Sequence, residues 1–237
     1  MSDVRPIKSP PVYNTCRWSA RMLFRLFYRI RILGEDRVPR SGPVLLVANH
    51  GSFFDPPIIG ATLQARDTNF LARRSLFKGP LGWLIRRCNS IPLDDEAGDI
   101  KAIKQVLERL GEGEPVLIFP EGSRTYDGKL QPFRDGVRLI ARRGKCPVVP
   151  IAIEGAFESW PRTRPLPTPF GCRLAVEYGE PIPADQLTGD DGNERLERII
   201  DRMRLELRER MRAGTGGRFP PAGPADEPLH ADDQSVG

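Results

Sequence analysis

Residues 44–55 read VLLVANHGSFFD, an apolar run followed by a polar turn. Five consecutive apolar residues, with no alternating polar positions, are typical of a strand that is buried on both faces. Such strands belong to sheets that helices cover on both sides. His50 and Asp55 follow the run, and the ligand crevice of an open α/β sheet lies beyond the carboxyl ends of its strands. The segment therefore predicts a central strand with a functional site at its end.

Similar apolar runs return along the chain, separated by segments with helical spacing of their apolar residues. Strands that alternate with helices predict an α/β domain with a largely parallel or mixed sheet flanked by helices. The predicted strands are residues 44–48, 69–72, 116–119, 148–153 and 173–178. The predicted helices are residues 56–64, 81–88, 98–110, 133–143 and 193–212, in addition to one near the N-terminus.

The segment from Thr15 to about Leu33 is predicted to be an amphipathic helix. Arginines at positions 17, 21, 25 and 29 form one basic stripe, and Trp, Phe and Leu residues fill much of the remaining surface. The longest apolar run, Met22-Leu23-Phe24, is too short to cross a bilayer. The composition favours a helix that lies on a membrane surface. The alternative is an ordinary helix that packs on the domain and keeps its arginines in solvent.

The charge is distributed unevenly along the chain. There are 36 Lys or Arg and 31 Asp or Glu, a net charge of +5, and most of the excess lies in the first 40 residues. A nucleic-acid-binding protein usually spreads its basic surface over the folded domain, so we expect no nucleic-acid partner. The four cysteines form no Cys-x-x-Cys pair, which predicts neither a zinc site nor a disulfide framework. With no apolar signal-peptide core near the start, this pattern favours a reducing, cytosolic compartment.

We expect three segments along the chain. Residues 1–37 form an N-terminal arm with the amphipathic helix, residues 38–212 form one folded domain, and residues 213–237 form a tail. The tail is rich in Gly, Pro and Asp and has almost no large apolar residue. Because it cannot offset the entropy lost on ordering, it is predicted to be disordered and without a catalytic role.

Only two histidines occur, and one of them, His230, lies in the predicted tail. His50 is therefore the candidate for proton transfer near neutral pH. Asp55 has two interpretations, which are compatible with each other. It can cap the helix that Pro56 begins, or it can fold back onto the imidazole and fix its tautomer.

The second polar turn is FPEGSRT, residues 119–125, which again follows an apolar strand. Gly122 permits a tight turn, and Arg124 offers a planar pair of donors that matches a phosphate. Ser123 or Thr125 can add a hydroxyl donor. The alternative is a surface turn with a solvated arginine.

Ser52 suggests a hydrolase nucleophile next to His50, but residues two apart in a loop rarely present both groups to each other. The chain also has no Gly-x-Ser-x-Gly motif of the kind that carries a nucleophilic serine in α/β-hydrolases. We therefore do not expect an acyl-enzyme through Ser52.

His50, four further residues and Asp55, followed about 65 residues later by FPEGSR, resemble the 1-acylglycerol-3-phosphate acyltransferase family. The resemblance extends over residues 38–183. It includes Gly82-Trp83 with Ile91-Pro92-Leu93, and Val148-Val149-Pro150-Ile151.

The resemblance implies a glycerolphosphate-acyltransferase-like fold and roles for individual residues. His50 would be the general base on the acceptor hydroxyl, and Asp55 its partner. Glu121, Gly122, Ser123 and Arg124 would bind the glycerol phosphate. Attack on an acyl carrier protein or coenzyme A thioester would be direct, with no metal or cofactor.

One position departs from the family pattern. The family often has a basic residue after the block that corresponds to residues 91–94, whereas this chain has Asp95. An acid repels a phosphate, so another cation would have to compensate. The candidates are Arg73, Arg74, Lys78, Arg86 and Arg87, of which we assign Arg73 to the substrate site.

The resemblance thus implies an O-acyltransferase that uses the sn-2 hydroxyl of 1-acylglycerol-3-phosphate and gives phosphatidic acid for phospholipid synthesis. It would be a peripheral or monotopic protein on the cytoplasmic face of the cell membrane. Two alternatives remain. One is an acyltransferase for another lysophospholipid or an amine-bearing lipid, and the other is a non-catalytic membrane-binding module.

Overall fold

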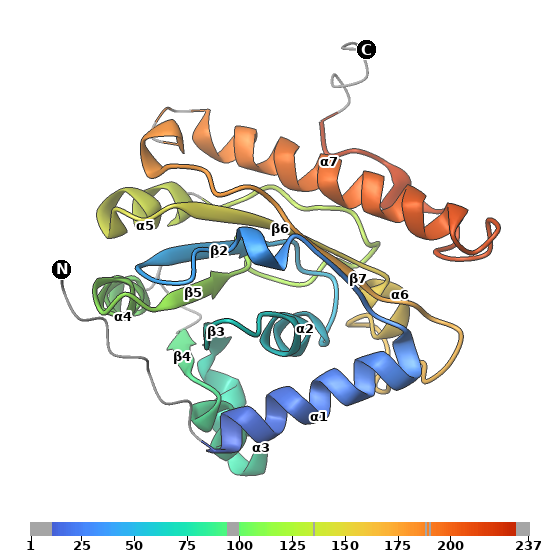
Figure 1. The fold of residues 1–237 in the computed structure, drawn as a ribbon, viewed down its shortest axis with the longest axis horizontal. Helices are drawn as coiled ribbons and strands as arrows, with labels where there is room; N and C mark the ends of the chain where they lie inside the picture. The colour runs from blue at the N-terminus through green and yellow to red at the C-terminus, as the bar shows by residue number, and fades with distance from the viewer. Residues whose placement is uncertain (1–10, 94–99, 135, 188, 190, 231–237) are drawn as a thin grey trace.

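The computed structural model describes residues 11–93, 100–134, 136–187, 189 and 191–230. Within these residues, seven strands form one sheet in the order β1-β7-β6-β2-β5-β3-β4, with helices on both faces (Figure 1). The strands are β1 (Arg31–Leu33), β2 (Val44–Ala48), β3 (Asn69–Arg73), β4 (Ser90–Leu93), β5 (Pro115–Ile118), β6 (Val148–Glu154) and β7 (Ala175–Tyr178). The helices are α1 (Pro11–Tyr28), α2 (Asp55–Thr62), α3 (Gly79–Arg87), α4 (Ile100–Gly111), α5 (Gly136–Gly144), α6 (Ala156–Ser159) and α7 (Gly192–Ala213). Short 3₁₀ helices are η1 (Glu35–Arg37), η2 (Arg74–Phe77), η3 (Ala184–Leu187) and η4 (Pro224–Asp226).

The sheet is mixed. Strands β6, β2, β5, β3 and β4 are parallel, β7 is antiparallel to β6, and β1 is parallel to β7. This confirms the predicted fold class. Because β2, β5 and β3 are neighbouring parallel strands, their carboxyl ends share one edge of the sheet. The two polar turns and Arg73 therefore meet at that edge.

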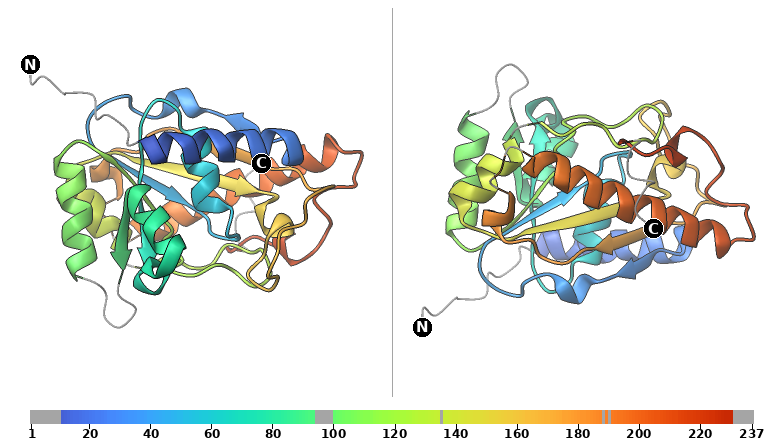
Figure 2. Two further views of the ribbon diagram at one scale, coloured as in Figure 1. Left: turned by 90° about the horizontal axis from the view of Figure 1, so that it is seen from below. Right: turned by 90° about the horizontal axis from the view of Figure 1, so that it is seen from above.

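Strand β2 is buried along its whole length and supplies both cores of the molecule. Val44 and Leu46 face a core with α1 and α2, while Leu45 and Val47 face a core with α4, α5 and α7. Figure 2 shows these two helical layers from opposite sides. The unbroken apolar run is thus explained by two covered faces, as expected for a central strand.

Helix α1 ends earlier than predicted, at Tyr28 rather than near Leu33. Arg29 has a positive φ of 47°, and the next residues form β1, which pairs with β7. Sheet hydrogen bonds therefore replace the last expected helical turn. β1, which lies in the predicted N-terminal arm, is thus part of the same sheet as the strands of the predicted domain.

One side of α1 packs on the domain while other side chains of the helix face solvent. Tyr13, Phe24 and Tyr28 are buried, and the last two rings pack edge-on against Phe54. Trp18, by contrast, is 66% exposed. The two interpretations of this helix are thus not exclusive. None of the helices among the described residues is long and apolar enough to span a bilayer.

Residues 214–230 are ordered, whereas a disordered tail was predicted from residue 213. The guanidinium of Arg204 donates to the carbonyl of Ala225, and Arg208 donates to Asp226. Backbone carbonyls and a carboxylate that pair with the arginines of α7 hold this segment in place. The amino-acid composition predicted disorder because the segment has almost no large apolar residues. The structure shows that polar contacts fix the segment instead.

Arg204 provides a test of how much this polar network stabilises the fold. Its side chain is fully buried, and Nη2 lies 2.7 Å from Oδ1 of Asp201. We expect Arg204→Ala to lower the free energy of unfolding by about 3–5 kcal/mol, because a buried carboxylate loses its cation. Arg198→Ala removes an exposed pair with Glu194 and should change it by only about 0.5 kcal/mol. Urea unfolding followed by circular dichroism measures both, and equal effects would contradict the assignment.

Candidate active site

His50 and Asp55 form a hydrogen-bonded pair between β2 and α2. Nδ1 of His50 lies 2.8 Å from Oδ2 of Asp55, and the Asp55 side chain is 1% exposed. The same oxygen accepts the backbone N–H groups of Gly51 (2.8 Å) and Ser52 (2.7 Å). Because Oδ2 only accepts, we assign the proton to Nδ1. Nε2 is then the unprotonated nitrogen that is available to a substrate.

The contacts of Asp55 also settle its predicted role as a helix cap. Helix α2 begins at Asp55, but the carboxylate bonds the preceding turn and the imidazole. The next two residues, Pro56 and Pro57, have no N–H group to offer. The cap interpretation is therefore wrong, and the interpretation as a partner of His50 is the one that fits.

The imidazole is held from a second direction. The ring of Phe119, the first residue after β5, stacks on it with centroids 4.1 Å apart and an interplanar angle of 19°. The His50 side chain remains 18% exposed. The ring is thus oriented by Asp55 and Phe119 and still has access to the surface.

Glu121, which is predicted to bind the substrate, is a buried carboxylate in the second polar turn. It is only 6% exposed, and its two oxygens accept the backbone N–H groups of His50 and Gln131. Burial, the largest cause, raises its pKa to about 8, and the nearby Asp55 adds to the shift. Glu121 therefore connects the His50 turn to the loop that follows residue 130.

Gly122 makes the tight turn that the sequence predicted. Its φ is 73°, a conformation that favours glycine. A Cβ at this position would lie 2.5 Å from Cζ of Arg134, so the guanidinium of Arg134 packs directly over the glycine. Ser123 follows in the same turn and is partly buried.

Thr125 is used inside the loop rather than as a ligand. Its hydroxyl donates to Asp127 (2.8 Å), while its backbone N–H donates to the carbonyl of His50 (3.0 Å). The second contact joins the two polar turns. The idea that Thr125 supplies a hydroxyl to phosphate is therefore wrong.

Arg124 lies on the ring of Phe53, with Cζ 3.4 Å from the ring centroid. Its Nη1 is buried and has no hydrogen-bond partner among the described residues. Partial burial lowers the pKa of Arg124, and the like charges of Arg162 and Arg73 lower it further. An orphaned donor in a region of excess positive charge is a favourable place for an anion. Because Arg73 contributes to the lowered pKa of Arg124, the end of β3 lies close enough to Arg124 for the two charges to interact.

Ser52 has no role as a nucleophile in this geometry. Its side chain is fully buried, and Oγ donates to the carbonyl of Trp160 while accepting the N–H of Phe54. These bonds fix the turn that carries His50. The structure agrees with the prediction against an acyl-enzyme at this serine.

Sequence reasoning did not find Phe53, Phe119 and Arg162 as parts of the site. Arg162 donates to the carbonyl of Arg124 and lies over the ring of Tyr126, at 3.9 Å from its centroid. Arg162 is separated from Arg124 by 38 positions, so only the tertiary fold brings them together. The two phenylalanines lie inside the two motifs, and the only sign in the sequence that they belong to the site was an aromatic residue close to His50 or Arg124.

Asp95, which departs from the family pattern, lies outside the described residues.

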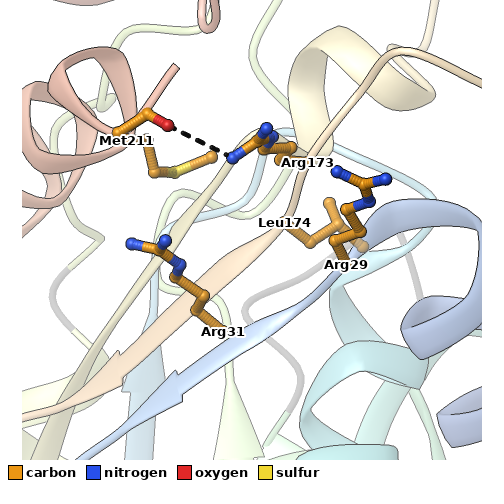
Figure 3. Close-up of a pocket in the computed structure, with 6 residues that line it drawn as sticks. Arg29, Arg31, Arg173, Leu174 and Met211 are labelled. Atoms are coloured by element: carbon orange, nitrogen blue, oxygen red, sulfur yellow. Dashed lines mark hydrogen bonds between the residues drawn. The ribbon is translucent and has the colours of Figure 1, made fainter. Parts of the chain in front are cut away.

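Two hollows lie elsewhere on the surface. A pocket of about 470 Å³ opens at η2, α3 and β4, directly after Arg73 in the chain. The one in Figure 3 lies where Arg29, Arg31 and Arg173 gather near the ends of α1 and α7, and the dashed line marks the bond from Arg173 to Gly214. It holds only about 10 Å³, room for about one water molecule.

The fold and the site place the chain among α/β proteins that combine a His–Asp proton-transfer pair with an arginine-bearing, anion-binding loop. The model of the Acyltransferase family matches residues 29–154, more than half of the chain. The chain belongs to this family.

Curated relatives and a solved structure agree with this assignment. A chloroplastic 1-acyl-sn-glycerol-3-phosphate acyltransferase of Brassica napus is 33% identical over 57% of this chain and 40% of that protein. A lyso-ornithine lipid O-acyltransferase of Pseudomonas aeruginosa is 34% identical over 64% of this chain and 56% of its own length. The crystal structure of the 1-acyl-sn-glycerophosphate acyltransferase PlsC of Thermotoga maritima matches with a TM-score of 0.72 at 27% identity, covering 82% of this chain and 79% of that one. The chain spans about 40% of the length of the chloroplastic relatives from Brassica napus and Arabidopsis thaliana.

Proposed function

We propose that this protein transfers a fatty acyl group from a thioester to the hydroxyl of a lysophospholipid. The observation that carries the proposal is the His50–Asp55 pair, oriented at the edge of the sheet beside Arg124. Nε2 of His50 takes the proton of the acceptor hydroxyl as its oxygen attacks the thioester carbonyl carbon. The carbon–sulfur bond then breaks, and the leaving thiolate takes the proton from the imidazolium. Asp55 stabilises that imidazolium while it exists.

The proposed acceptor is 1-acylglycerol-3-phosphate, acylated at its sn-2 hydroxyl to give phosphatidic acid for phospholipid synthesis. Its phosphate would satisfy the orphaned Nη1 of Arg124 and reduce the repulsion from Arg73 and Arg162. Gly122 and Ser123 shape the same turn. The proposed donor is an acyl carrier protein or coenzyme A thioester, and the mechanism needs no metal or cofactor.

Arg124→Ala tests the phosphate site. We expect kcat/KM for lysophosphatidic acid to fall about 10- to 150-fold, equivalent to the 1.5–3 kcal/mol of a hydrogen bond to a charged group. Arg124→Lys should recover only part of the loss, because an ammonium cannot present two parallel donors. Arg143→Ala, on the exposed surface of α5, is the matched control. Steady-state kinetics with varied acceptor measure the effect, and an unchanged acceptor KM and rate would remove Arg124 from the site.

A second acceptor class has its own support. The Pseudomonas aeruginosa relative is named for lyso-ornithine lipid, an amine-bearing acceptor without a phosphate, and Asp95 replaces a residue that is often basic in the family. A panel of lysophosphatidic acid, other lysophospholipids and lyso-ornithine lipid, with product analysis, separates these candidates. A preference for lyso-ornithine lipid that Arg124→Ala leaves intact would overturn the phosphate assignment. Complete inactivity on every acceptor would favour the non-catalytic alternative, which the intact His50–Asp55 pair argues against.

We further propose that the protein binds the cytoplasmic face of the cell membrane peripherally through α1. Trp18 and Leu26 are 66% and 68% exposed on a helix that has three arginines and no acid. Truncation is a poor test, because Phe24, Tyr28 and β1 belong to the fold. We expect Trp18→Ser to weaken sedimentation with anionic vesicles, since its ring inserts at the headgroup boundary. Ile100→Ser, at an apolar position on α4 that is 83% exposed, should have no effect, and equal binding by both variants would contradict the α1 contact.

A further inference from the structure

The face formed by η2 and α3 exposes large apolar side chains. Leu76 is 43% exposed, Leu81 52% and Trp83 56%. Gly82 allows close contact between the two elements, because a Cβ there would lie 2.2 Å from the carbonyl carbon of Phe77. η2 and α3 therefore present these side chains to solvent as one packed unit.

The same face is strongly basic. Residues 73–93 contain five Lys or Arg and no Asp or Glu. The guanidinium of Arg87 lies 5.0 Å from the ring centroid of Trp83, and that of Arg86 lies 5.7 Å from the ring of Phe77. Trp83 is exposed, and a cation beside an exposed aromatic ring is typical of surfaces at the boundary between lipid headgroups and acyl chains.

The 470 Å³ pocket opens on this face, and its cations are Arg74, Lys78 and Arg86. Helix α1 continues the face. α1 and α3 lie side by side in both Figure 1 and the left view of Figure 2. Neither helix contains an acid, so the charged side chains that α1 and α3 contribute to the combined surface are all positive. η2 also follows directly after Arg73, which connects the surface to the edge of the active site.

We propose that η2 and α3 form the second half of the membrane-docking surface, and that the pocket at Lys78 takes a phosphate group of an anionic bilayer lipid. This inference rests on the proposed membrane contact of α1 and extends it. With both halves docked, the edge of the site at Arg73 faces the bilayer. A lysolipid then reaches His50 from the membrane without passing through water.

An acidic carrier protein is the other partner that positive charge alone would suit. Binding to an acidic protein would use the positive charge but would not explain the three large apolar side chains that η2 and α3 expose. Insertion at the headgroup boundary of a bilayer uses both the positive charge and the apolar side chains. The continuity with α1, which exposes the same combination of Trp, Leu and Arg, also favours a bilayer.

The test uses the full chain and vesicles of phosphatidylcholine, with and without phosphatidylglycerol. Each variant has a matched control on the other face of the sheet. Trp83→Ser is compared with Ile100→Ser, and Lys78→Glu with Arg143→Glu, which changes the net charge equally. We expect Lys78→Glu to weaken partition onto anionic vesicles at least about fivefold, the equivalent of ~1 kcal/mol for one basic residue near the surface. Trp83→Ser should also weaken partition, because its ring no longer inserts at the headgroup boundary, and both controls should stay near wild type. Turnover of a short-chain, monomeric acceptor should stay unchanged in all four.

The outcomes separate this inference from the proposed function. If Trp18→Ser loses vesicle binding while Trp83→Ser and Lys78→Glu keep it, α1 alone docks and the inference is wrong, although peripheral binding stands. If Lys78→Glu binds vesicles normally but raises KM for an acyl carrier protein donor, the surface is a protein site and the inference is overturned. If the wild-type protein binds neither vesicle, both the inference and the proposed membrane contact fall.

Discussion

His50→Ala should lower acyl transfer by about 10²–10⁴-fold, because a lipid hydroxyl is a poor nucleophile without a positioned base. Loss of alignment between hydroxyl and thioester adds to the effect. The fold should survive, since the imidazole is partly exposed and its main-chain N–H still bonds Glu121. Initial rates with a defined lysolipid and acyl thioester measure the loss, and circular dichroism checks the fold.

Ser52→Ala is the informative companion to His50→Ala. Removing Oγ breaks its bonds to Trp160 and Phe54, so some stability is lost. Transfer should nevertheless continue, because Ser52 is buried and forms no intermediate. Full activity of His50→Ala would contradict the role of His50 as the base. Inactivity of a folded Ser52→Ala protein would contradict the purely structural role of Ser52.

Asp55→Asn should lower transfer by up to about 10⁴-fold, the size of the effect that the corresponding substitution has in Ser-His-Asp enzymes. The asparagine oxygen can take the place of Oδ2 and still accept the N–H groups of Gly51 and Ser52. The turn therefore keeps its shape. A neutral amide cannot stabilise the imidazolium that forms during proton transfer, so the chemistry fails in an intact protein.

Thermal unfolding and initial rates, measured on the same Asp55→Asn sample, distinguish chemistry from structure. We expect a transition close to that of the wild type together with severe loss of rate. An unfolded variant, or a folded one with normal rate, would show that Asp55 serves the turn and not the base.

Five of the seven strands in the described residues were predicted, because their signal is local, whereas β1 and β4 were not predicted. β2 was predicted at its observed bounds, and the turn after it was recognised because apolar residues give way abruptly to Asn49-His50-Gly51. β1 was missed because its three residues are fixed by pairing with β7, which lies about 140 positions later. No local pattern in the sequence reports such a partner.

The candidate site also contains some residues that local sequence predicts and others whose environment depends on the tertiary fold. His50, Asp55, Gly122 and Arg124 were identified by residue type and spacing within two short motifs. Glu121 was predicted to bind substrate, and its burial and two backbone partners could not be predicted from the sequence, because they depend on the tertiary fold. The tail was misassigned because its partners, Arg204 and Arg208, lie inside α7 and reveal their burial only in the fold.

The central claim is direct, base-catalysed transfer from thioester to lysolipid, and a single-turnover experiment tests it most directly. The protein is mixed with one equivalent of labelled acyl thioester and excess lysophosphatidic acid, and the label is followed in lipid, protein and free fatty acid. The account predicts that the label moves into phosphatidic acid without passing through the protein, and that His50→Ala leaves it on the thioester. Label that accumulates on the protein before reaching lipid, or that appears only as free fatty acid, would contradict it.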